Sequence, residues 1–328
     1  MRVLITGGAG LIGSNLIGPL LDRGDEVLVA DNLWRGSIEN IGDRVGSRFD
    51  RATQFVECDL RDREACRRVT TNVDLVIHLA DIVAGIKYVF ENELFVFRNN
   101  LLINSNVLDA AIENQVSQFL YVGTACSYPQ EKQAKVGLPP LIESDAYPAD
   151  PESGYGWSKL MGEYECGLAH NEGKIQTAIL RLHNVYGPPC HLDPERSQVI
   201  PALCRKVIEH PNPPIVVWGS GEQRRAFVFV EDVVLAICKA LDKGWGEGVI
   251  QIGPEESVSI KEVAELIVGI SGRYLDLRFD KNMREGDQDR VADNSKALEV
   301  LGWAPRVQIE TGLEKTYEWV RQHLRKKN

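Results

Sequence analysis

Hydrophobic residues along the chain gather in short runs, separated by stretches of helical periodicity. The runs predict β-strands at 2–6, 26–30, 54–57, 74–80, 118–123 and 175–182. The stretches between them predict helices at 10–24, 61–70, 92–115 and 155–173. Because strands alternate with helices, the chain is expected to fold through βαβ units into a parallel sheet.

The pattern changes after Asn184. Two segments, 186–197 and 209–225, are rich in proline and glycine and predict loops and short elements laid across the carboxyl edge of the sheet. We therefore predict an α/β fold, in which a doubly wound parallel sheet is joined to a smaller C-terminal α/β domain.

A glycine-rich turn joins the first strand to the first helix. In "ITGGAGLIGSNL", Gly7 permits the tight turn, Gly10 lets the backbone approach a pyrophosphate and Gly13 lets the helix pack closely. Asp31, at the end of the second strand, can accept hydrogen bonds from both hydroxyls of a ribose and repels a 2′-phosphate. The pattern predicts a Rossmann domain that prefers NAD to NADP, a preference that Arg35 partly softens.

The NAD site sets the expected domain boundary. We assign residues 1–183, joined by part of 226–253, to the NAD-binding Rossmann domain, and 184–328 mainly to a substrate domain. Asp59 and Leu60 follow the third strand, where they either flank adenine or form an ordinary cap of the next helix.

Composition narrows the class of protein. The 328 residues are 44% hydrophobic and 26% charged, which suits a folded soluble protein, and the net charge of −10 with scattered basic residues speaks against a nucleic-acid partner. Seven cysteines form no CxxC pair, and the histidines show no metal spacing, so we expect a reducing cytoplasm and no metal. No run of 18 apolar residues occurs, so no membrane span is expected.

Tyr155 and Lys159 lie four apart on a predicted helix and so share one face. A tyrosine of reference pKa ~10 is a poor base at neutral pH, and lowering that pKa by ~3 units takes roughly 4 kcal/mol. Lys159 and a positive nicotinamide ring are able to supply this. Such a pair alone usually marks an ordinary helix face, but Thr124, at the end of a preceding strand, is placed to hold a substrate oxygen while Tyr155 removes its proton.

Segments spread over essentially the full length resemble the extended short-chain dehydrogenase/reductase family, specifically its nucleotide-sugar epimerases, dehydratases and reductases. They are "TGGAGLIGS", "HLADIVAGI", "GTACSYP", "YGWSK", "LRLHNVYGP", "WGSGEQRRAF", "REGDQDRVADNSKALEVLGWAP" and "GLEKTYEW". The resemblance implies that Thr124, Tyr155 and Lys159 are catalytic, and that Tyr155 deprotonates a sugar hydroxyl at carbon 4 while hydride passes to NAD. It also implies a homodimer built through two long helices, here about 92–115 and 155–173.

The resemblance also assigns residues to two ligands. For NAD we predict contacts from Gly7, Gly10, Leu11, Ile12, Gly13, Asp31, Asn32, Asp59, Leu60, Leu79, Ala80, Asn99, Tyr155 and Lys159. For a nucleotide-diphosphate sugar we predict contacts from Gly85, Thr124, Cys126, Asn184, Gln198, Val199, Arg225 and Arg284, with the two arginines on the diphosphate. Asp81 departs from the family, which often has a small residue after "LA".

Cys126 points to a particular chemistry within the family. "GTACSYP" looks like the segment of GDP-mannose 3,5-epimerases and GDP-fucose synthases that carries an epimerising cysteine. Once carbon 4 is a ketone, protons on carbons 3 and 5 become acidic, and an acid/base pair can remove and return them. Those enzymes pair the cysteine with lysine or histidine where this chain has Gln198, which cannot exchange a proton. Another residue such as His191, Glu195 or Arg196 substitutes, or Cys126 works alone at one carbon, or it is a buried thiol without a role.

The sequence thus predicts an NAD-dependent nucleotide-sugar epimerase that acts through a transient 4-keto intermediate and inverts carbon 3 and/or 5 of a GDP-mannose-like sugar. One alternative is a UDP-sugar 4-epimerase, which needs no cysteine and tolerates Gln198. A second is a 4-keto-sugar reductase or dehydratase of the same family, and Asp31 speaks against a reductase that consumes NADPH. A remote alternative is a non-catalytic NAD-sensing module, a class that often loses the tyrosine or lysine of the pair retained here.

Overall fold

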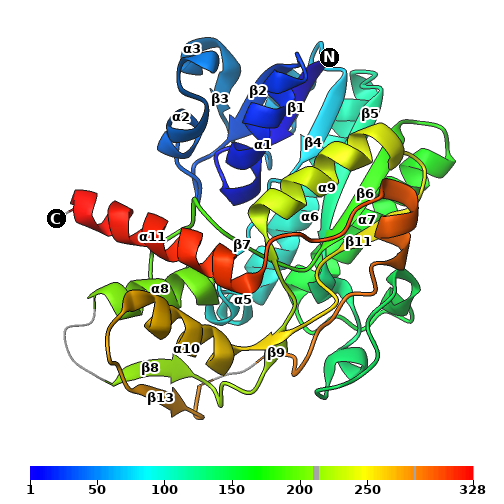
Figure 1. Ribbon diagram of the computed structural model, residues 1–328. Coiled ribbons are helices and arrows are strands. Elements are labelled where there is room, and N and C mark those ends of the chain that lie inside the picture. Colours follow the sequence, from blue (N-terminus) through cyan, green and yellow to red (C-terminus); the bar gives the residue numbers. More distant parts are fainter. Residues whose placement is uncertain (210–213, 284–285, 328) are drawn as a thin grey trace.

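A computed structural model describes residues 1–209, 214–283 and 286–327. Seven parallel strands form the central sheet, in the order β11-β6-β5-β4-β1-β2-β3 (Figure 1). Their bounds are β1 (Arg2–Thr6), β2 (Glu26–Asp31), β3 (Phe55–Glu57), β4 (Leu75–His78), β5 (Gln118–Thr124), β6 (Gln176–Leu182) and β11 (Val249–Ile252). The strand order reverses between β1 and β4, which is the doubly wound Rossmann arrangement. The predicted fold class and the six predicted strands are confirmed.

Helices cover both faces of this sheet and also build the C-terminal part. Their bounds are α1 (Leu11–Asp22), α2 (Glu39–Val45), α3 (Arg51–Gln54), α4 (Arg63–Thr70), α5 (Ile86–Glu91), α6 (Glu93–Glu113), α7 (Gly154–Asn171), α8 (Val199–Glu209), α9 (Val230–Lys243), α10 (Ile260–Ser271) and α11 (Ile309–Lys327). Successive side chains of β1 alternate, so that Val3 and Ile5 join the core under α1 and α9 while Leu4 joins the core under α4, α6 and α7. Both faces are therefore buried, as the continuous apolar runs of the strands require.

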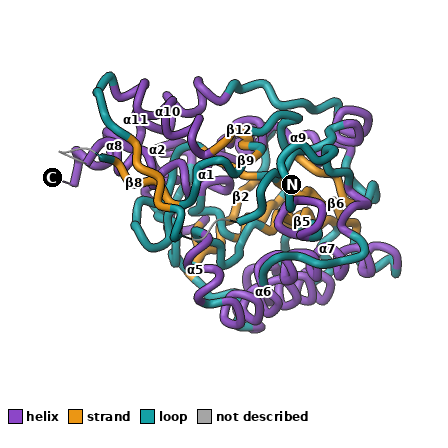
Figure 2. Tube along the Cα trace, turned by 90° about the horizontal axis from the view of Figure 1, so that it is seen from below, coloured by secondary structure: helices purple, strands orange, loops and turns teal. Residues whose placement is uncertain are grey.

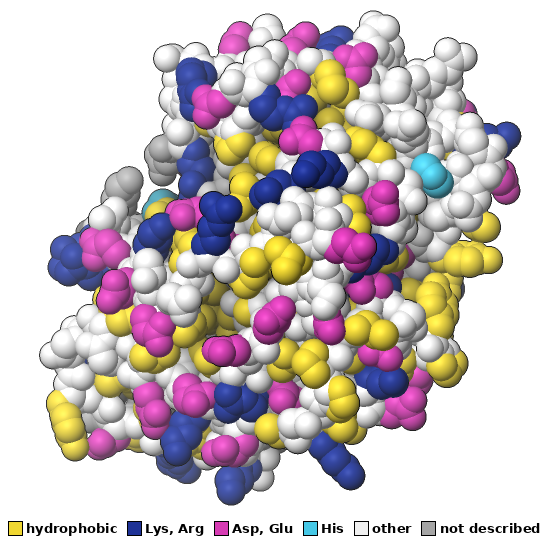
Figure 3. Space-filling model, turned by 45° about the vertical axis from the view of Figure 1, so that its right-hand side comes forward, with side chains coloured by type: hydrophobic (Ala, Val, Ile, Leu, Met, Phe, Trp, Pro, Cys, Tyr) yellow, Lys and Arg dark blue, Asp and Glu magenta, His cyan; other side chains and the backbone are white. Residues whose placement is uncertain are grey.

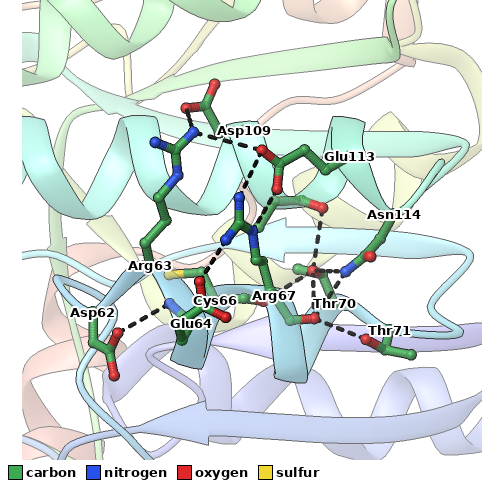
Figure 4. Close-up of polar contacts among 11 residues, drawn as sticks. Asp62, Arg63, Glu64, Cys66, Arg67, Thr70, Thr71, Asp109, Glu113 and Asn114 are labelled. Atoms are coloured by element: carbon green, nitrogen blue, oxygen red, sulfur yellow. Dashed lines mark hydrogen bonds and ion pairs between the residues drawn. The ribbon is translucent and has the colours of Figure 1, made fainter.

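The outer edge where α4 meets α6 carries a network of ion pairs (Figure 4). Arg67 Nε donates to Glu113 Oε2 over 2.7 Å, and Arg63 Nη2 lies 3.0 Å from Asp109 Oδ2. These side chains are exposed, so solvent screens the pairs and each contributes little to the stability of the fold. The Thr70 hydroxyl oxygen accepts a hydrogen bond from the Asn114 amide over 2.7 Å, which joins α4 to the residue that follows α6.

The C-terminal part lies below the carboxyl ends of the central strands in Figure 1. It consists of α8, α10 and α11 with three two-stranded pairs, β7 (Asn184–Tyr186) with β10 (Phe227–Phe229), β8 (Ile215–Trp218) with β13 (Leu277–Asp280), and β9 (Arg224–Arg225) with β12 (Val258–Ser259). As the predicted loops and short elements imply, 187–197 is a loop and 209–225 contains the short strands β8 and β9, with residues 210–213 outside the described part.

The surface mixes charges of both signs. On the face shown in Figure 3, basic and acidic side chains are interspersed, without a continuous basic area. Among the described residues, no helix is both long and apolar enough to cross a membrane. All seven cysteines are free.

Candidate active site

A cleft of about 1680 Å³ separates the carboxyl ends of the central strands from the C-terminal part. Its wall includes every described residue that the sequence assigned to either ligand, except Asn99. Asn99 lies on α6, where its amide accepts a hydrogen bond from Arg61 over 2.9 Å and donates to the Phe95 carbonyl. Arg284, the second predicted diphosphate arginine, lies outside the described residues.

The glycine loop between β1 and α1 forms one end of the cleft. Gly7 has φ +68°, and a Cβ there would lie 2.9 Å from the backbone of Ala80. A Cβ on Gly13 would lie 2.5 Å from the Cα of Gly8. Within the described chain no side chain caps the N-terminus of α1, and its first turn holds no acidic residue. Because the unpaired N–H groups and the positive end of the helix dipole face the cleft, this end fits the pyrophosphate of NAD.

Asp31, the last residue of β2, fits the ribose of NAD. Its two carboxylate oxygens accept hydrogen bonds from the backbone N–H groups of Ala9 (3.0 Å) and Leu33 (2.8 Å). Burial raises the pKa of Asp31, while these hydrogen bonds oppose the shift. Each oxygen keeps a second lone pair, so the carboxylate is fixed in place and still able to accept ribose hydroxyls.

Tyr155 and Lys159 project from α7 toward Asp81, which follows β4. The Tyr155 hydroxyl donates to Asp81 Oδ2 over 3.2 Å, and Lys159 Nζ lies 3.4 Å from the same oxygen. Burial and the Asp81 carboxylate raise the pKa of Tyr155 well above its ordinary value, against a smaller opposing effect of the Thr124 hydroxyl. The sequence led us to expect a lowered pKa. In the protein alone the charge of Lys159 is instead paired with Asp81.

Cys126 sits in the turn after β5 with an unexpected partner. Thr124, the last residue of β5, accepts the Cys126 N–H over 3.3 Å, which fixes the turn. Arg290 Nη1 donates to Cys126 Sγ over 3.3 Å, and this buried guanidinium also contacts Asp287 and Gln133. Burial opposes the charge of Arg290, but Cys126 and Asp287 outweigh it and the pKa of Arg290 is raised. The guanidinium can therefore stabilise negative charge on the sulfur.

Sequence reasoning missed the contact of Arg290 with Cys126 and the contacts of Asp81 with Tyr155 and Lys159. Arg290 lies 164 positions after Cys126, in the segment "REGDQDRVADN", of which only the first arginine was predicted to bind a ligand. The available signal was a second arginine six positions after Arg284 in that segment.

The opposite end of the cleft offers polar groups for the rest of a substrate. Burial and the nearby Arg290 lower the pKa of Arg225 to about 10, although its Nη1 donates to the Asp287 carbonyl over 2.6 Å. The buried Oδ1 of Asn184 and Oε1 of Gln223 have no hydrogen-bond partner among the described residues. Two crowded arginines and two unpaired polar side chains suit a ligand with a diphosphate and hydroxyl groups.

Gln198 lines the cleft just before α8, as do Val199 and Gly85. A Cβ on Gly85 would lie 2.7 Å from the Ser197 carbonyl, so this glycine lets the two segments approach. Of the three suggested substitutes for the missing lysine, His191 and Glu195 line the cleft. Arg196 instead places its guanidinium 5.0 Å from the ring centre of Trp34.

Comparisons with known proteins agree with this geometry. The sequence model of the NAD dependent epimerase/dehydratase family matches residues 3–253. GDP-mannose 3,5-epimerase 1 of Oryza sativa subsp. indica is 33% identical over 326 residues, which cover 99% of this chain and 83% of the relative. A UDP-glucose 4-epimerase of Thermotoga maritima, solved with UDP-glucose, superposes with a TM-score of 0.84 at 29% identity, covering 99% of this chain and 100% of the other. A UDP-glucose 4-epimerase of Thermus thermophilus in complex with NAD has a TM-score of 0.82 at 27% identity and coverages of 98% and 99%.

Proposed function

Because the chain belongs to the NAD dependent epimerase/dehydratase family, we propose that it epimerises a nucleotide-diphosphate sugar through a transient 4-keto intermediate, inverting carbon 3 and/or 5 of a GDP-mannose-like sugar. It is an enzyme of that family and it is NAD dependent. The observation that carries the finer proposal is the contact between Arg290 and Cys126, placed in the same cleft as Tyr155.

The residues divide between holding NAD and moving protons. Residues 1–183, with part of 226–253, hold the cofactor, through the glycine loop and Asp31. When bound, NAD supplies the acceptor and later the donor of hydride at carbon 4. Thr124 holds the oxygen on carbon 4, and Tyr155 takes its proton and later returns it. Residues 184–328 mainly hold the nucleotide sugar, with Arg225 on the diphosphate.

Cys126 acts on the neighbouring carbon while carbon 4 is a ketone. The thiolate removes the acidified proton from one face of the carbon, and inversion is completed when a second proton donor delivers a proton to the opposite face. Arg290 stabilises the thiolate by its hydrogen bond but remains protonated and does not exchange the proton itself. Gln198 cannot do so either, so the donor on the opposite face is His191 or Glu195, which line the cleft, or solvent. The deuterium experiment below gives the number of inverted carbons.

A UDP-sugar 4-epimerase is the second candidate, favoured by one observation. Gln198 lines the cleft where a second acid/base group is expected, and inversion at carbon 4 alone requires none. In that case the 4-keto sugar turns over and receives hydride on its other face, and Cys126 only packs.

The test is incubation of the purified protein with GDP-mannose, and then with UDP- and dTDP-sugars, in deuterated water. We expect deuterium at carbon 3 or 5, read by mass and proton spectra, and its loss in a Cys126→Ser variant. Cys238→Ser is the matched control, because Cys238 is a half-buried thiol on α9 outside the cleft wall.

The outcomes separate the two candidates. A stereochemical change at carbon 4 without deuterium in the sugar ring makes the protein a 4-epimerase. Net production of a reduced or dehydrated sugar replaces epimerisation by the reductase or dehydratase chemistry found elsewhere in the family.

We further propose that the enzyme is a homodimer that works in the cytoplasm. Support for the dimer comes from exposed hydrophobic side chains on α6 and α7, and support for the location from free cysteines in a chain with no pairing pattern.

A further inference from the structure

Gln133 is a buried amide whose hydrogen bonds fix the direction in which it points. It ends the short 3-10 turn Gln130–Gln133 and is 1% exposed. Its Nε2 donates to the backbone carbonyls of Tyr128 over 3.0 Å and of Pro129 over 3.3 Å. Carbonyl oxygens only accept, so the NH2 group must face them, and the amide oxygen Oε1 is turned toward Arg290, whose Nε donates to it.

The same glutamine fastens the turn after β5 to the distant segment that carries Arg290. Its backbone carbonyl accepts the N–H groups of Gln288 over 2.9 Å and of Asp289 over 3.3 Å. The Asp289 carboxylate in turn accepts the N–H groups of Gly137 over 3.1 Å and of Arg290 over 2.9 Å. The backbone on either side of the Gln133–Arg290 contact is therefore fixed as well.

The Arg290 guanidinium offers a different nitrogen to each of its partners. Its Nε donates to Gln133 Oε1 and its Nη2 to Asp287 Oδ2, which leaves Nη1 to donate to Cys126 Sγ over 3.3 Å. The guanidinium is planar, so two fixed nitrogens determine where the third one points. The side chains of Arg290 and Asp287 are only 5% and 6% exposed, so solvent does not readily replace a contact that is lost here.

Two other titratable groups face Cys126, namely Tyr155 on α7 and Arg225 on β9. Arg225 directs its Nη1 to the backbone carbonyls of Arg224 and Asp287, over 2.7 and 2.6 Å. Among the described residues, Arg290 alone donates a side-chain hydrogen bond to the sulfur. The stabilisation of a thiolate therefore depends on where Arg290 Nη1 is held.

We propose that Gln133 is a positioning residue of the reaction, which holds Arg290 Nη1 on Cys126 and thereby enables the sulfur to exchange a proton with carbon 3 or 5 of the 4-keto sugar. In this step the C–H bond breaks as an S–H bond forms, and its electron pair passes into the enolate of the sugar. Arg290 stays protonated and Gln133 exchanges nothing. The inference rests on the proposed function, and it leaves the chemistry of Tyr155 at carbon 4 unaffected.

The Gln133→Met variant tests this division between the carbons. Methionine has a similar length but offers Arg290 no oxygen. With GDP-mannose in deuterated water, we expect the single-turnover rate of deuterium entry at carbon 3 or 5 to fall about tenfold or more. Hydride transfer from carbon 4, followed by the absorbance of NADH, should change less than about threefold. Equal losses of both rates, or an unchanged labelling rate, overturn the proposal.

Two further variants separate positioning from folding. Gln130→Met, at an exposed glutamine in the same turn, is the matched control and should keep both rates. Gln133→Asn is shorter by one methylene group, so it withdraws the amide oxygen from Arg290 without placing an apolar group there. It should show the same split between the two rates, and it replaces Gln133→Met if thermal unfolding shows that the methionine variant does not fold.

Alkylation of Cys126 by iodoacetamide tests the contact without substrate or cofactor. The mass of the peptide that contains Cys126 gives the rate, and the midpoint of this rate against pH reports how readily the thiolate forms, whatever the access to the sulfur. We expect the midpoint to move to higher pH by about one pH unit in Gln133→Met and to stay in place in Gln130→Met. An unmoved midpoint in Gln133→Met overturns the proposal.

The two levels of inference fail in different ways. A wild type that takes up no deuterium at carbon 3 or 5 overturns the proposed function, and with it the role of Gln133. A wild type that takes up deuterium as fast as Gln133→Met and Gln133→Asn overturns the role of Gln133 alone.

Discussion

At the scale of single residues, two reactive groups in the cleft each contact a charged side chain. Lys159 has the carboxylate of Asp81, and the sulfur of Cys126 has the guanidinium of Arg290. Removing one partner of a buried charged pair leaves the other uncompensated, which costs more than the pair contributes. Variants at these four positions therefore need a readout of folding beside the readout of activity.

Arg225 and Arg224 are adjacent in sequence but have different surroundings. Arg225 lines the cleft, and burial together with Arg290 lowers its pKa to about 10, so a diphosphate there relieves an unfavourable charge. We expect Arg225→Gln to raise the KM for the nucleotide sugar by about tenfold or more with a smaller change in kcat, since a charge-assisted hydrogen bond contributes about 1.5–3 kcal/mol. Steady-state kinetics of the deuterium-labelling reaction measures both values.

Arg224→Gln is the control for that prediction. Its guanidinium bonds Ser257 Oγ over 3.1 Å and Glu262 over 3.2 Å, away from the cleft wall. We expect this variant to leave KM unchanged. A similar rise in KM for both variants would assign the effect to the β9–β12 pair rather than to a diphosphate contact.

Single residues near each other in sequence were the most predictable part of the site. Thr124 and Cys126 share one strand end, and Tyr155 and Lys159 share one helix turn, so local geometry places them. The partners Asp81 and Arg290 come from distant segments, after β4 and after β13. Local sequence spacing cannot predict contacts between side chains that only the tertiary fold brings together.

At the scale of elements, the packing of α1 against the glycine loop decides whether NAD binds. A methyl group on Gly13 would lie 2.5 Å from Gly8, a distance that backbone atoms cannot tolerate. We expect Gly13→Ala to weaken NAD binding by at least about tenfold, because the loop must move away from the pyrophosphate position. Calorimetric titration with NAD measures the loss.

Gly18→Ala on the same helix separates that effect from helix propensity. A Cβ there would lie 3.6 Å from its nearest neighbour, Val45, which is an ordinary contact. Alanine in a helix interior is favoured over glycine by about 0.5–1 kcal/mol, so this variant should bind NAD normally and unfold at slightly higher temperature. Equal NAD affinity in both variants would contradict the packing argument.

His78 ties three elements together and makes their packing depend on pH. At the end of β4, its ring bonds Thr6 on β1 over 2.7 Å and Asn104 on α6 over 3.1 Å. Burial lowers the pKa of His78 to about 3, below the value of about 6.5 in the unfolded chain. The contribution of neutral His78 to the free energy of unfolding is fully present above pH 6.5 and is lost as the pH falls toward 3. Between pH 7 and pH 5 this loss is about 2 kcal/mol.

Urea unfolding at pH 7 and pH 5 measures this loss. In His78→Gln, the stability difference between the two pH values should be about 2 kcal/mol smaller than in the wild type. If His78→Gln shows the same difference in unfolding free energy between pH 7 and pH 5 as the wild type, protonation of His78 does not destabilise the folded protein.

The elements of the central sheet were predictable, and those of the C-terminal part were not. Strands buried on both faces read as continuous apolar runs. β4 ends at His78 rather than at residue 80, and beyond it the Ala80 N–H bonds the Thr6 hydroxyl rather than a backbone carbonyl. The pairs β8–β13 and β9–β12 are short and join distant segments, so they leave no periodic pattern.

At the scale of the whole molecule, α6 and α7 form an outer layer with an uncovered apolar surface. The two helices lie side by side (Figure 2). Their exposed large hydrophobic residues are Leu94, Phe95 and Leu102 on α6, and Met161, Tyr164 and Leu168 on α7. The α7 residues recur at spacings of three and four, so they form one stripe along that helix. Exposed stripes of this kind mark interaction surfaces.

A second copy of the chain is the simplest cover for this surface, because a twofold axis places like stripes against each other. In Met161→Arg, such an interface would contain two arginines, one from each copy, and their like charges would repel each other. We expect Met161→Arg to convert a wild type of twice 36.6 kDa into a species of one chain in sedimentation equilibrium. Leu298→Arg, at a 60% exposed leucine in the short π-helix Ala297–Leu301, should remain a dimer. Since α7 also carries Tyr155 and Lys159, a wild type that sediments as one chain would mean that this helix holds its catalytic residues without support from a partner.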